Sequence, residues 1–369
     1  MSFSDMFVYV PFAVYALLLA VFVLRCRFGV KVKIVWAAVL LLALSKHWCF
    51  MTFGSSAFNP EFPAVLVVAW DAAFVGAVVL CVLSSVLFFR FPYRDVALPF
   101  ASWSVAALGV WCGVAVPGVK EVRLRFPALP SSLEGYRIVQ ISDLHCSSAA
   151  RKWRTEAVVD AVNRLDADLV CLTGDYVDGE VRDRGDDLKP LAEISARDGV
   201  YYVTGNHEYY RDGPGWAEWF RGNGMRFLSN ECVFPHKGLA LGGVNDFAGP
   251  RFGAEVPDVR HAFRAATNGE FRVLLQHRPK AAADNIREVG VDLQLSGHTH
   301  GGVAPGIRRL VAGYNGGFSR GAYRIGSGVL YVSAGTGQWA GFLSRVFNPS
   351  EITLITLSRG DAVRGSLRD

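Results

Sequence analysis

Charged residues are scarce in the first third of this 369-residue chain. Residues 1–119 contain only seven Lys and Arg and four Asp and Glu. That composition excludes an ordinary water-soluble domain, in which roughly a quarter of the residues are charged. A membrane-spanning helix needs about 20 mainly apolar residues. We therefore predict a transmembrane region at 1–119 with about four helices, over residues 7–24, 34–53, 62–89 and 96–119.

A basic segment is missing before the first apolar stretch, and further apolar stretches follow it, so a cleavable signal peptide fits poorly. The connections at 25–33 and 90–95 carry six Lys and Arg, against four on the opposite side. Because cytoplasmic loops hold the excess of Lys and Arg, both termini are expected outside the cytoplasm. The sequence thus predicts a multi-pass protein of the cell (inner) membrane with an extracytoplasmic C-terminal domain.

One acid, Asp71, interrupts the third apolar stretch. A carboxylate facing lipid is costly, so an acid inside a membrane span is by default a functional candidate. The alternative is a carboxyl group that is bonded between packed helices or lies near an interface. The sequence leaves both interpretations open.

The seven cysteines show no CxxC or zinc-knuckle spacing, and the chain has no evident internal repeats. A structural zinc site built on thiolates is therefore not expected, and cysteine usage leaves the compartment undecided. Residues 120–369 carry 31 Lys and Arg against 29 Asp and Glu, a net charge of +2, and the bases do not gather in a stripe. This balance argues against a nucleic-acid partner.

Beyond a predicted linker at 120–135, short apolar stretches alternate with amphipathic ones. The apolar stretch at 135–143, for example, is followed by one with helical spacing at 154–165. Such alternation predicts an α/β domain over 136–369 that contains much parallel sheet. The tail at 321–357 differs, because its strand-like stretches are joined by tight glycine turns, which predicts an antiparallel addition.

Polar residues that suit metal binding follow each predicted strand of this domain. In open α/β sheets, ligands bind beyond the carboxyl ends of the strands, so these residues are expected to converge. Imidazole, carboxylate and amide oxygen suit manganese, iron or zinc, and seven ligands are too many for one ion. We predict two divalent metal ions about 3.5–4 Å apart, with Asp175 as the bridging carboxylate. The candidate ligands are Asp143, His145, Asp175, Asn206, His277, His298 and His300.

The order of these motifs resembles one enzyme family. The chain reads D-x-H at 143–145, G-D-x-x-D at 174–178, G-N-H-E at 205–208, a lone His277, and G-H-x-H at 297–300. This set is similar to the calcineurin-like metallophosphoesterases, and the continuation to about residue 357 is similar to a bacterial membrane-attached branch of that family. The resemblance implies a four-layer α/β/β/α sandwich, with two central sheets and helices outside.

The resemblance also implies a role for each residue. One ion would be held by Asp143, His145, Asp175 and His300, and the other by Asp175, Asn206, His277 and His298. His207 would be a catalytic residue near the leaving-group oxygen, with its proton held by Asp143 or another nearby carboxylate. Asp178 would support the site from behind the ligands, although a turn or helix-cap role stays open.

Together these patterns predict a membrane-anchored phosphoesterase, a hydrolase in which a metal-activated hydroxide attacks a phosphate ester or pyrophosphate bond. The expected partners are the lipid bilayer and a phosphorylated small molecule or lipid-linked phosphate. Two alternatives stay open: a catalytically silent membrane sensor or scaffold with the same fold, and a nuclease. Members of the branch often have Gln directly after the G-H-x-H-G-G stretch, whereas this chain has Val303. The residues that line the substrate site are therefore undefined, and Arg308, Arg309 and Arg320 are candidates for phosphate contacts there.

Overall fold

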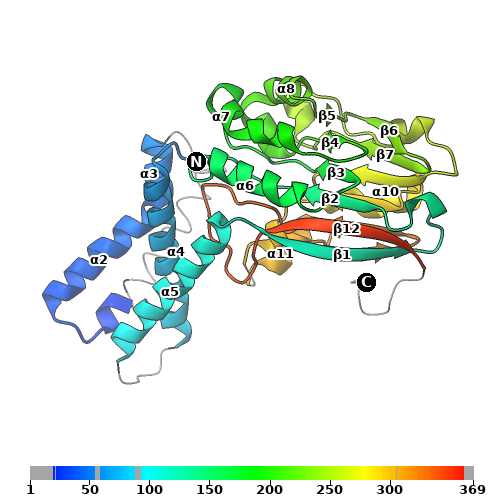
Figure 1. The fold of residues 1–369 in the computed structure, drawn as a ribbon. Helices are drawn as coiled ribbons and strands as arrows, with labels where there is room; N and C mark the ends of the chain where they lie inside the picture. The colour runs from blue at the N-terminus through cyan, green and yellow to red at the C-terminus, as the bar shows by residue number, and fades with distance from the viewer. Residues whose placement is uncertain (1–19, 21, 55–58, 88–92, 305, 361–369) are drawn as a thin grey trace. The chain divides into compact units, whose positions relative to one another are not determined.

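The computed structural model describes residues 20, 22–54, 59–87, 93–304 and 306–360. These residues form two compact units: 1–115 together with 339–347, and 116–338 together with 348–369. The first unit is helical (Figure 1). Its described helices are α2 (Val30–Leu44), α3 (Lys46–Phe53), α4 (Ala64–Val86) and α5 (Arg94–Val114).

Two of these helices, α4 and α5, are long and apolar enough to cross a membrane. A third span would be the pair α2 and α3, which is bent by 51°. The bend falls at Ser45, directly before the Lys46 and His47 that interrupt the predicted span at 34–53. The predicted span at 7–24 lies almost entirely outside the described residues. The predicted span at 96–119 is too long, because α5 ends at Val114.

Asp71 is bonded within the helical unit. Its carboxylate pairs with the Lys46 ammonium, and both side chains are fully buried. It also accepts a hydrogen bond from the backbone N–H of Leu343, 3.2 Å away, in the segment 339–347 that belongs to this unit. The Lys46 ammonium lies 4.9 Å from the centroid of the Phe74 ring. Of the two interpretations of Asp71, the structure supports a carboxyl bonded between packed helices.

The second unit contains two six-stranded sheets. In the first, the strand order is β1-β12-β2-β3-β4-β5, and in the second β10-β11-β9-β8-β7-β6. The first sheet consists of β1 (Gly118–Phe126), β2 (Arg137–Ile141), β3 (Leu169–Leu172), β4 (Val200–Tyr202), β5 (Arg226–Phe227) and β12 (Glu351–Arg359). The second consists of β6 (Glu231–His236), β7 (Leu239–Gly243), β8 (Phe271–Leu275), β9 (Leu293–Ser296), β10 (Gly321–Ile325) and β11 (Gly328–Val332).

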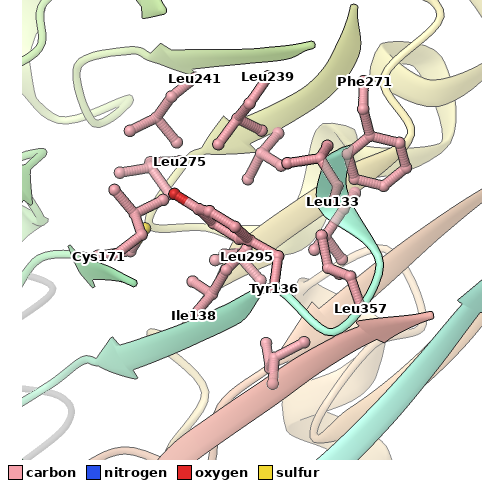
Figure 2. Close-up of a cluster of buried hydrophobic side chains, with 14 of the residues drawn as sticks. Leu133, Tyr136, Ile138, Cys171, Leu239, Leu241, Phe271, Leu275, Leu295 and Leu357 are labelled. Atoms are coloured by element: carbon pink, nitrogen blue, oxygen red, sulfur yellow. The ribbon is translucent and has the colours of Figure 1, made fainter. Parts of the chain in front are cut away.

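The two sheets pack face to face, with helices on their outer faces (Figure 1). Figure 2 shows the core between them, where Ile138 from the first sheet lies in one cluster with Leu275 and Leu295 from the second. The described helices of this unit are α6 (Lys152–Asn163), α7 (Val181–Leu188), α8 (Asn206–Gly222), α9 (Val259–Ala262), α10 (Ala282–Val289) and α11 (Arg308–Tyr314). Helices α6 and α8 pack on the first sheet, α9 and α10 on the second. The predicted four-layer α/β/β/α sandwich is confirmed.

Sequence pattern explains most of these elements. Strand β3, LVCL, is apolar throughout and buried at every position, as parallel strands covered on both faces are. In α6, Thr155, Val158, Val159 and Val162 recur at helical spacing and form its buried face. At the tail, β10 and β11 form an antiparallel hairpin and β12 pairs antiparallel with β2, as expected. In addition, β11 pairs parallel with β9 and β12 parallel with β1, so the predicted antiparallel addition is only partly correct. The predicted linker at 120–135, by contrast, contains most of strand β1.

Candidate metal centre

The predicted ligands all lie just beyond strand ends, and the fold brings them together. Asp143 and His145 follow β2, and Asp175 follows β3. Asn206 begins α8 directly after β4, His277 follows β8, and the G-H-x-H pair follows β9. Because β2, β3 and β4 are parallel in one sheet, and β8 and β9 in the other, the loops after them gather at one end of the sandwich.

Ligand atoms cluster in two groups, and a shared carboxylate links them. Those of Asp143, His145 and His300 lie within 4.8 Å of one another, and so do those of Asp175, His277 and His298. His145 Nε2 is 3.1 Å from His300 Nε2, and His277 Nε2 is 3.1 Å from Asp175 Oδ2. Asp175 also forms a third group with His145 and His207, so it lies between the other two.

The side chains present fit a pair of divalent cations. Imidazole nitrogens and carboxylate oxygens converge in buried surroundings without a thiolate among them, which suits manganese, iron or zinc. Among the described residues, the amide Oδ1 of Asn206 is buried and has no hydrogen-bond partner. A buried acceptor without a donor is costly, and a cation would satisfy it. That these residues bind metal stays a prediction.

Backbone conformation around the site is unusual. Asp143, His145, Asp175, His298 and His300 all have φ between +46° and +69°. Residues other than glycine uncommonly adopt this left-handed region, although asparagine, aspartate and histidine do so more often than the others, and it costs about 1–3 kcal/mol each where the structure imposes it. Both members of the D-x-H pair and both histidines of the G-H-x-H pair are turned in this way, which directs side chains two residues apart into one centre.

Glycines allow the strand-end loops to approach each other. A Cβ at Gly297 would overlap the side chains of Ser142 and Asp143, and a Cβ at Gly205 would overlap Asp175. A side chain at either position would therefore collide with the facing loop, which is why glycine stands there.

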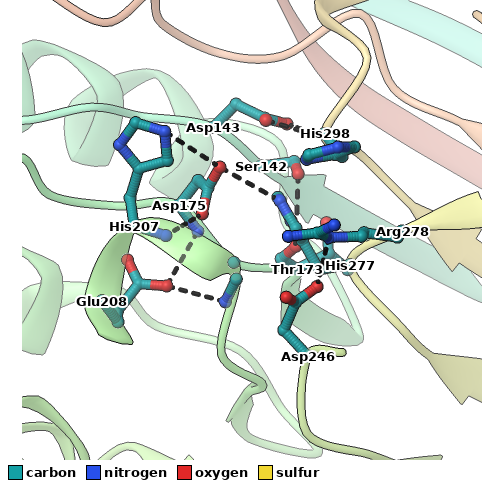
Figure 3. A network of polar contacts seen from close by, with 12 residues as sticks. Ser142, Asp143, Thr173, Asp175, His207, Glu208, Asp246, His277, Arg278 and His298 are labelled. Carbon is teal, nitrogen blue, oxygen red and sulfur yellow. Dashed lines mark hydrogen bonds and ion pairs between the residues drawn. The ribbon is translucent and has the colours of Figure 1, made fainter. Parts of the chain in front are cut away.

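The imidazole of His277 is oriented from behind. Its Nδ1 lies 2.7 Å from the carbonyl oxygen of Thr173, so Nδ1 carries the proton and Nε2 faces Asp175 (Figure 3). A hydrogen bond of this kind to the second ring nitrogen is common among metal-binding histidines.

Glu208, which had no role in the sequence analysis, fixes the loop that carries Asp175. Its carboxylate accepts backbone N–H bonds from Gly205 at 2.7 Å, Asp175 at 3.0 Å and Tyr176 at 2.7 Å. Figure 3 shows Glu208 beside Asp175. Burial, together with the charge of Asp175, raises the pKa of Glu208 to about 7. A signal was present, because a Glu three residues after the N-cap typically reaches back to the helix start.

His207 and Asp178 form a close pair at the edge of the ligand cluster. His207 Nδ1 lies 2.5 Å from Asp178 Oδ1, and the side chain of His207 is 18% exposed while that of Asp178 is buried. Burial lowers the pKa of His207, but the charges of Asp175 and Asp178 outweigh this effect and raise it to about 9. The carboxylate partner that the sequence left open is therefore Asp178.

Asp178 contacts a second imidazole as well. Its carboxylate lies 3.3 Å from His145 Nδ1, so it supports a ligand histidine from the rear. It does not cap a helix, since Glu180 is the N-cap of α7. The support role implied by the resemblance thus has a geometric basis, and the helix-cap alternative does not.

The three arginines that are candidates for phosphate contacts differ in their hydrogen-bond partners. Arg320 donates from Nη1 to Asn348 Oδ1 at 2.6 Å, and Asn348 in turn donates to the backbone carbonyl of His300. Arg308 donates from Nε to Ser319 Oγ at 3.0 Å. Arg309 lies beside it on α11. Arg308 and Arg320 therefore have structural partners near the G-H-x-H motif, and phosphate contact by any of the three stays a prediction.

Comparison with known proteins agrees with this geometry. A family model described as calcineurin-like phosphoesterase matches residues 136–302. The chain is 33% identical over 279 residues to a protein of Danio rerio named transmembrane protein with metallophosphoesterase domain, a match that covers 72% of this chain and 63% of that protein. It is 32% identical over 250 residues to an uncharacterized metallophosphoesterase of Helicobacter pylori, covering 68% and 66% respectively.

The chain thus spans a little under two thirds of the length of these two relatives. A third relative, an uncharacterized metallophosphoesterase of Aquifex aeolicus, is 31% identical over 241 residues, and the match covers 65% of this chain and 91% of that protein. The segment matched by the family model, 136–302, contains all the predicted ligands, His207 and Asp178. The chain belongs to the calcineurin-like metallophosphoesterase family.

Proposed function

We propose that this chain is a membrane-anchored, metal-dependent hydrolase of phosphoric ester or pyrophosphate bonds. The observation that supports it most is the pair of ligand groups that Asp175 links, with the His207–Asp178 pair beside them. When bound, two divalent ions would neutralise phosphoryl oxygens and lower the pKa of a water molecule to about 7. Manganese, iron and zinc all suit this ligand set, and the identity of the ions is part of the proposal.

The chain's own residues position the shared carboxylate and supply a proton to the leaving-group oxygen. Glu208 holds the Asp175 loop against the start of α8, so that the shared carboxylate keeps its place between the two groups. His207 donates from Nδ1 to Asp178, which leaves Nε2, 4.0 Å from Asp175 Oδ2, to carry the proton for the leaving-group oxygen. The carboxylate of Asp178 keeps this imidazole protonated and oriented, as a general acid requires.

Metal dependence is tested with one substitution and a matched control. Purified full-length chain is expected to hold transition metal and to hydrolyse bis(p-nitrophenyl) phosphate or p-nitrophenyl phosphate when Mn²⁺ is added. Asp175→Asn is expected to lose both metal and turnover. Asp187→Asn, which removes a buried carboxylate that pairs with Arg151 instead, is expected to keep them. Turnover and metal content unchanged in Asp175→Asn would rule out the proposed centre.

The proton-donor role of His207 predicts a dependence on the leaving group. Proton transfer to an alkoxide typically contributes about 10²–10⁴-fold, whereas p-nitrophenolate leaves without it. His207→Ala should therefore lower kcat for an alkyl phosphate far more than for p-nitrophenyl phosphate. Equal losses for the two substrates would show that His207 is not the acid.

We further propose that the substrate is linked to a lipid. The support is the anchoring of the chain by helices apolar enough to cross a bilayer, which keeps the enzyme where lipid phosphates concentrate. Full-length chain in vesicles should then hydrolyse a phosphorylated lipid in the same bilayer faster than its short-chain soluble analogue. The opposite order would favour a soluble phosphoester.

Two other functions are distinguished by the same preparation. A silent sensor or scaffold would bind metal yet show no turnover on any phosphoester. A nuclease would show activity that falls steeply with salt, because it would neutralise many phosphates at once. The net charge of +2 over residues 120–369 favours a small substrate, so we expect activity on small diesters to be insensitive to salt.

A further inference from the structure

Arg278 lies directly after the candidate ligand His277 and has no part in the chemistry proposed above. Its Nε donates to Asp246 Oδ2 at 3.0 Å, and its side chain is 27% exposed. Figure 3 shows the guanidinium close to His277, with Asp246 below it. A cation is therefore fixed beside the centre, where solvent or a ligand can still reach it.

Asp246 is built to hold this arginine. Its side chain is fully buried, its Oδ1 accepts the backbone N–H of Ala248 at 2.8 Å, and its own N–H donates to Thr204 Oγ1 at 3.3 Å. One carboxylate oxygen is thus used to shape the loop after β7 and the other to orient the guanidinium. A guanidinium carries five N–H donors, so its two Nη groups remain for a ligand or for a neighbouring hydroxyl.

Tyr210 shows on which side of the centre Arg278 lies. The Tyr210 ring centroid is 5.3 Å from that of His207. Burial raises the pKa of Tyr210, and the nearby positive charge of Arg278 opposes this rise, so the phenol lies within the electrostatic reach of the guanidinium. Tyr210 is 52% exposed, so this edge is accessible. Tyr210 thus lies next to His207 and within the electrostatic reach of Arg278, so Arg278 and His207 border the same accessible edge of the centre.

We propose that Arg278 is a specificity-determining residue that binds a negatively charged group carried by the leaving group, close to the scissile oxygen. The proposal rests on the proposed function, because it takes His207 as the marker of the leaving-group side. Without Arg278, such a group would lie near the buried carboxylate of Asp246 with no cation between them, and their repulsion would weaken its binding. The anionic group can be a carboxylate or a second phosphate, since a planar guanidinium binds both in the same bidentate way.

The test compares leaving groups that differ in charge but little in size. The substrates are 3-carboxyphenyl phosphate and 3-carbamoylphenyl phosphate, with 3-phosphonophenyl phosphate to distinguish a phosphate-like anion from a carboxylate. The full-length chain should show a kcat/KM about tenfold or more higher for an anionic substrate than for the neutral one, as a charged hydrogen bond provides. A preference for only one of the two anionic substrates shows whether Arg278 binds a carboxylate or a phosphate-like group.

Three variants assign this preference to Arg278. Arg278→Gln should lower the ratio of anionic to neutral kcat/KM to about one while kcat on the neutral substrate stays within about threefold, and Arg278→Lys should keep part of it. Asp246→Asn, which loosens the arginine without removing its charge, should give an intermediate ratio. Arg260→Gln removes an exposed arginine that pairs with Glu288, and it should leave the ratio unchanged. A ratio near one in the unaltered chain, or a full ratio in Arg278→Gln, overturns the proposal.

A binding measurement separates this inference from the proposed function. Titration calorimetry with 3-carboxybenzyl and 3-carbamoylbenzyl phosphonates, which cannot be hydrolysed, reports the same preference without turnover. If no substrate is hydrolysed but the anionic phosphonate binds about tenfold tighter in an Arg278-dependent way, the proposed function fails and the role of Arg278 stands. If neutral substrates are hydrolysed and neither readout shows a preference, the role of Arg278 fails alone.

Discussion

At the scale of single residues, one carboxylate serves two imidazoles that are expected to do different work. Asp178 lies 2.5 Å from His207 Nδ1 and 3.3 Å from His145 Nδ1. The shorter contact is to the partly exposed histidine, which must gain and lose a proton, and the longer one to the buried candidate ligand, which must not. The two histidines hold the pKa of Asp178 well below its usual value despite its burial, so the carboxylate stays charged.

A change in pH dependence follows from this contact. His207 must be protonated to donate, so activity on an alkyl phosphate should fall as pH rises through its pKa, which Asp175 and Asp178 raise to about 9 against the effect of burial. Asp178→Asn removes one of these charges and lowers that pKa. The alkaline limb of the kcat profile should then move down by about one pH unit or more.

The control for this shift is Asp187→Asn, which alters a buried carboxylate elsewhere in the unit. Its profile should match that of the unaltered chain. An alkaline limb that stays in place, or moves up, in Asp178→Asn would mean that Asp178 does not hold the proton of His207.

At the scale of elements, the α/β alternation was predictable because buried parallel strands are uniformly apolar, as in LVCL of β3. Strand β1 was not predicted, because it is an edge strand that pairs with β12 alone, and its side chains alternate between exposed and buried only near its end. The gathering of ligands after parallel strands was likewise predictable. The positive φ values of Asp143 and His145, and the contacts of Glu208, were not, because they depend on loops packing against each other.

The burial of Lys46 between α2 and α4 was unpredictable for the same reason, because it depends on a partner far away in the sequence. By hydropathy, Lys46 interrupts an apolar stretch. In the structure its charge is compensated by Asp71 on α4, which lies 25 residues away, and no local sequence pattern reveals such a partner. Lys46 thus begins α3 as a buried residue beside Phe50 and Phe74.

This pair predicts a non-additive effect of substitution. Removing one partner of a buried ion pair leaves an uncompensated charge and typically costs about 3–5 kcal/mol, whereas replacing both by apolar groups is often close to neutral. Lys46→Met and Asp71→Leu should each lower the unfolding temperature of the full-length chain in detergent. The double variant should be more stable than either single variant. Losses that simply add would show that the two side chains do not compensate each other.

At the scale of the whole molecule, the pairing of Lys46 alters the count of charges that sets orientation. In the sequence, six Lys and Arg lie in the connections at 25–33 and 90–95, against four on the other side, one of which is Lys46. Because Lys46 is buried and paired with Asp71, it is not a loop charge. By the same criterion Arg94 is not a loop charge either, since it is buried and pairs with Asp95, and the comparison becomes five against three. The three on the other side, Lys120, Arg123 and Arg125, lie in strand β1 of the folded unit. The excess on the side of the two connections is therefore the same as the sequence suggested, although each side has one loop charge fewer.

The orientation can be read from protease access to a C-terminal tag. If the Lys and Arg of the two connections lie in the cytoplasm, the phosphoesterase unit is outside, and external protease should remove the tag from spheroplasts whose inner membrane is intact. A cytoplasmic enzyme followed in the same sample must stay undigested, which shows that the membrane held. Loss of the tag only after lysis would place the unit in the cytoplasm, and the substrate would then have to be a phosphoester of the inner leaflet or of the cytoplasm.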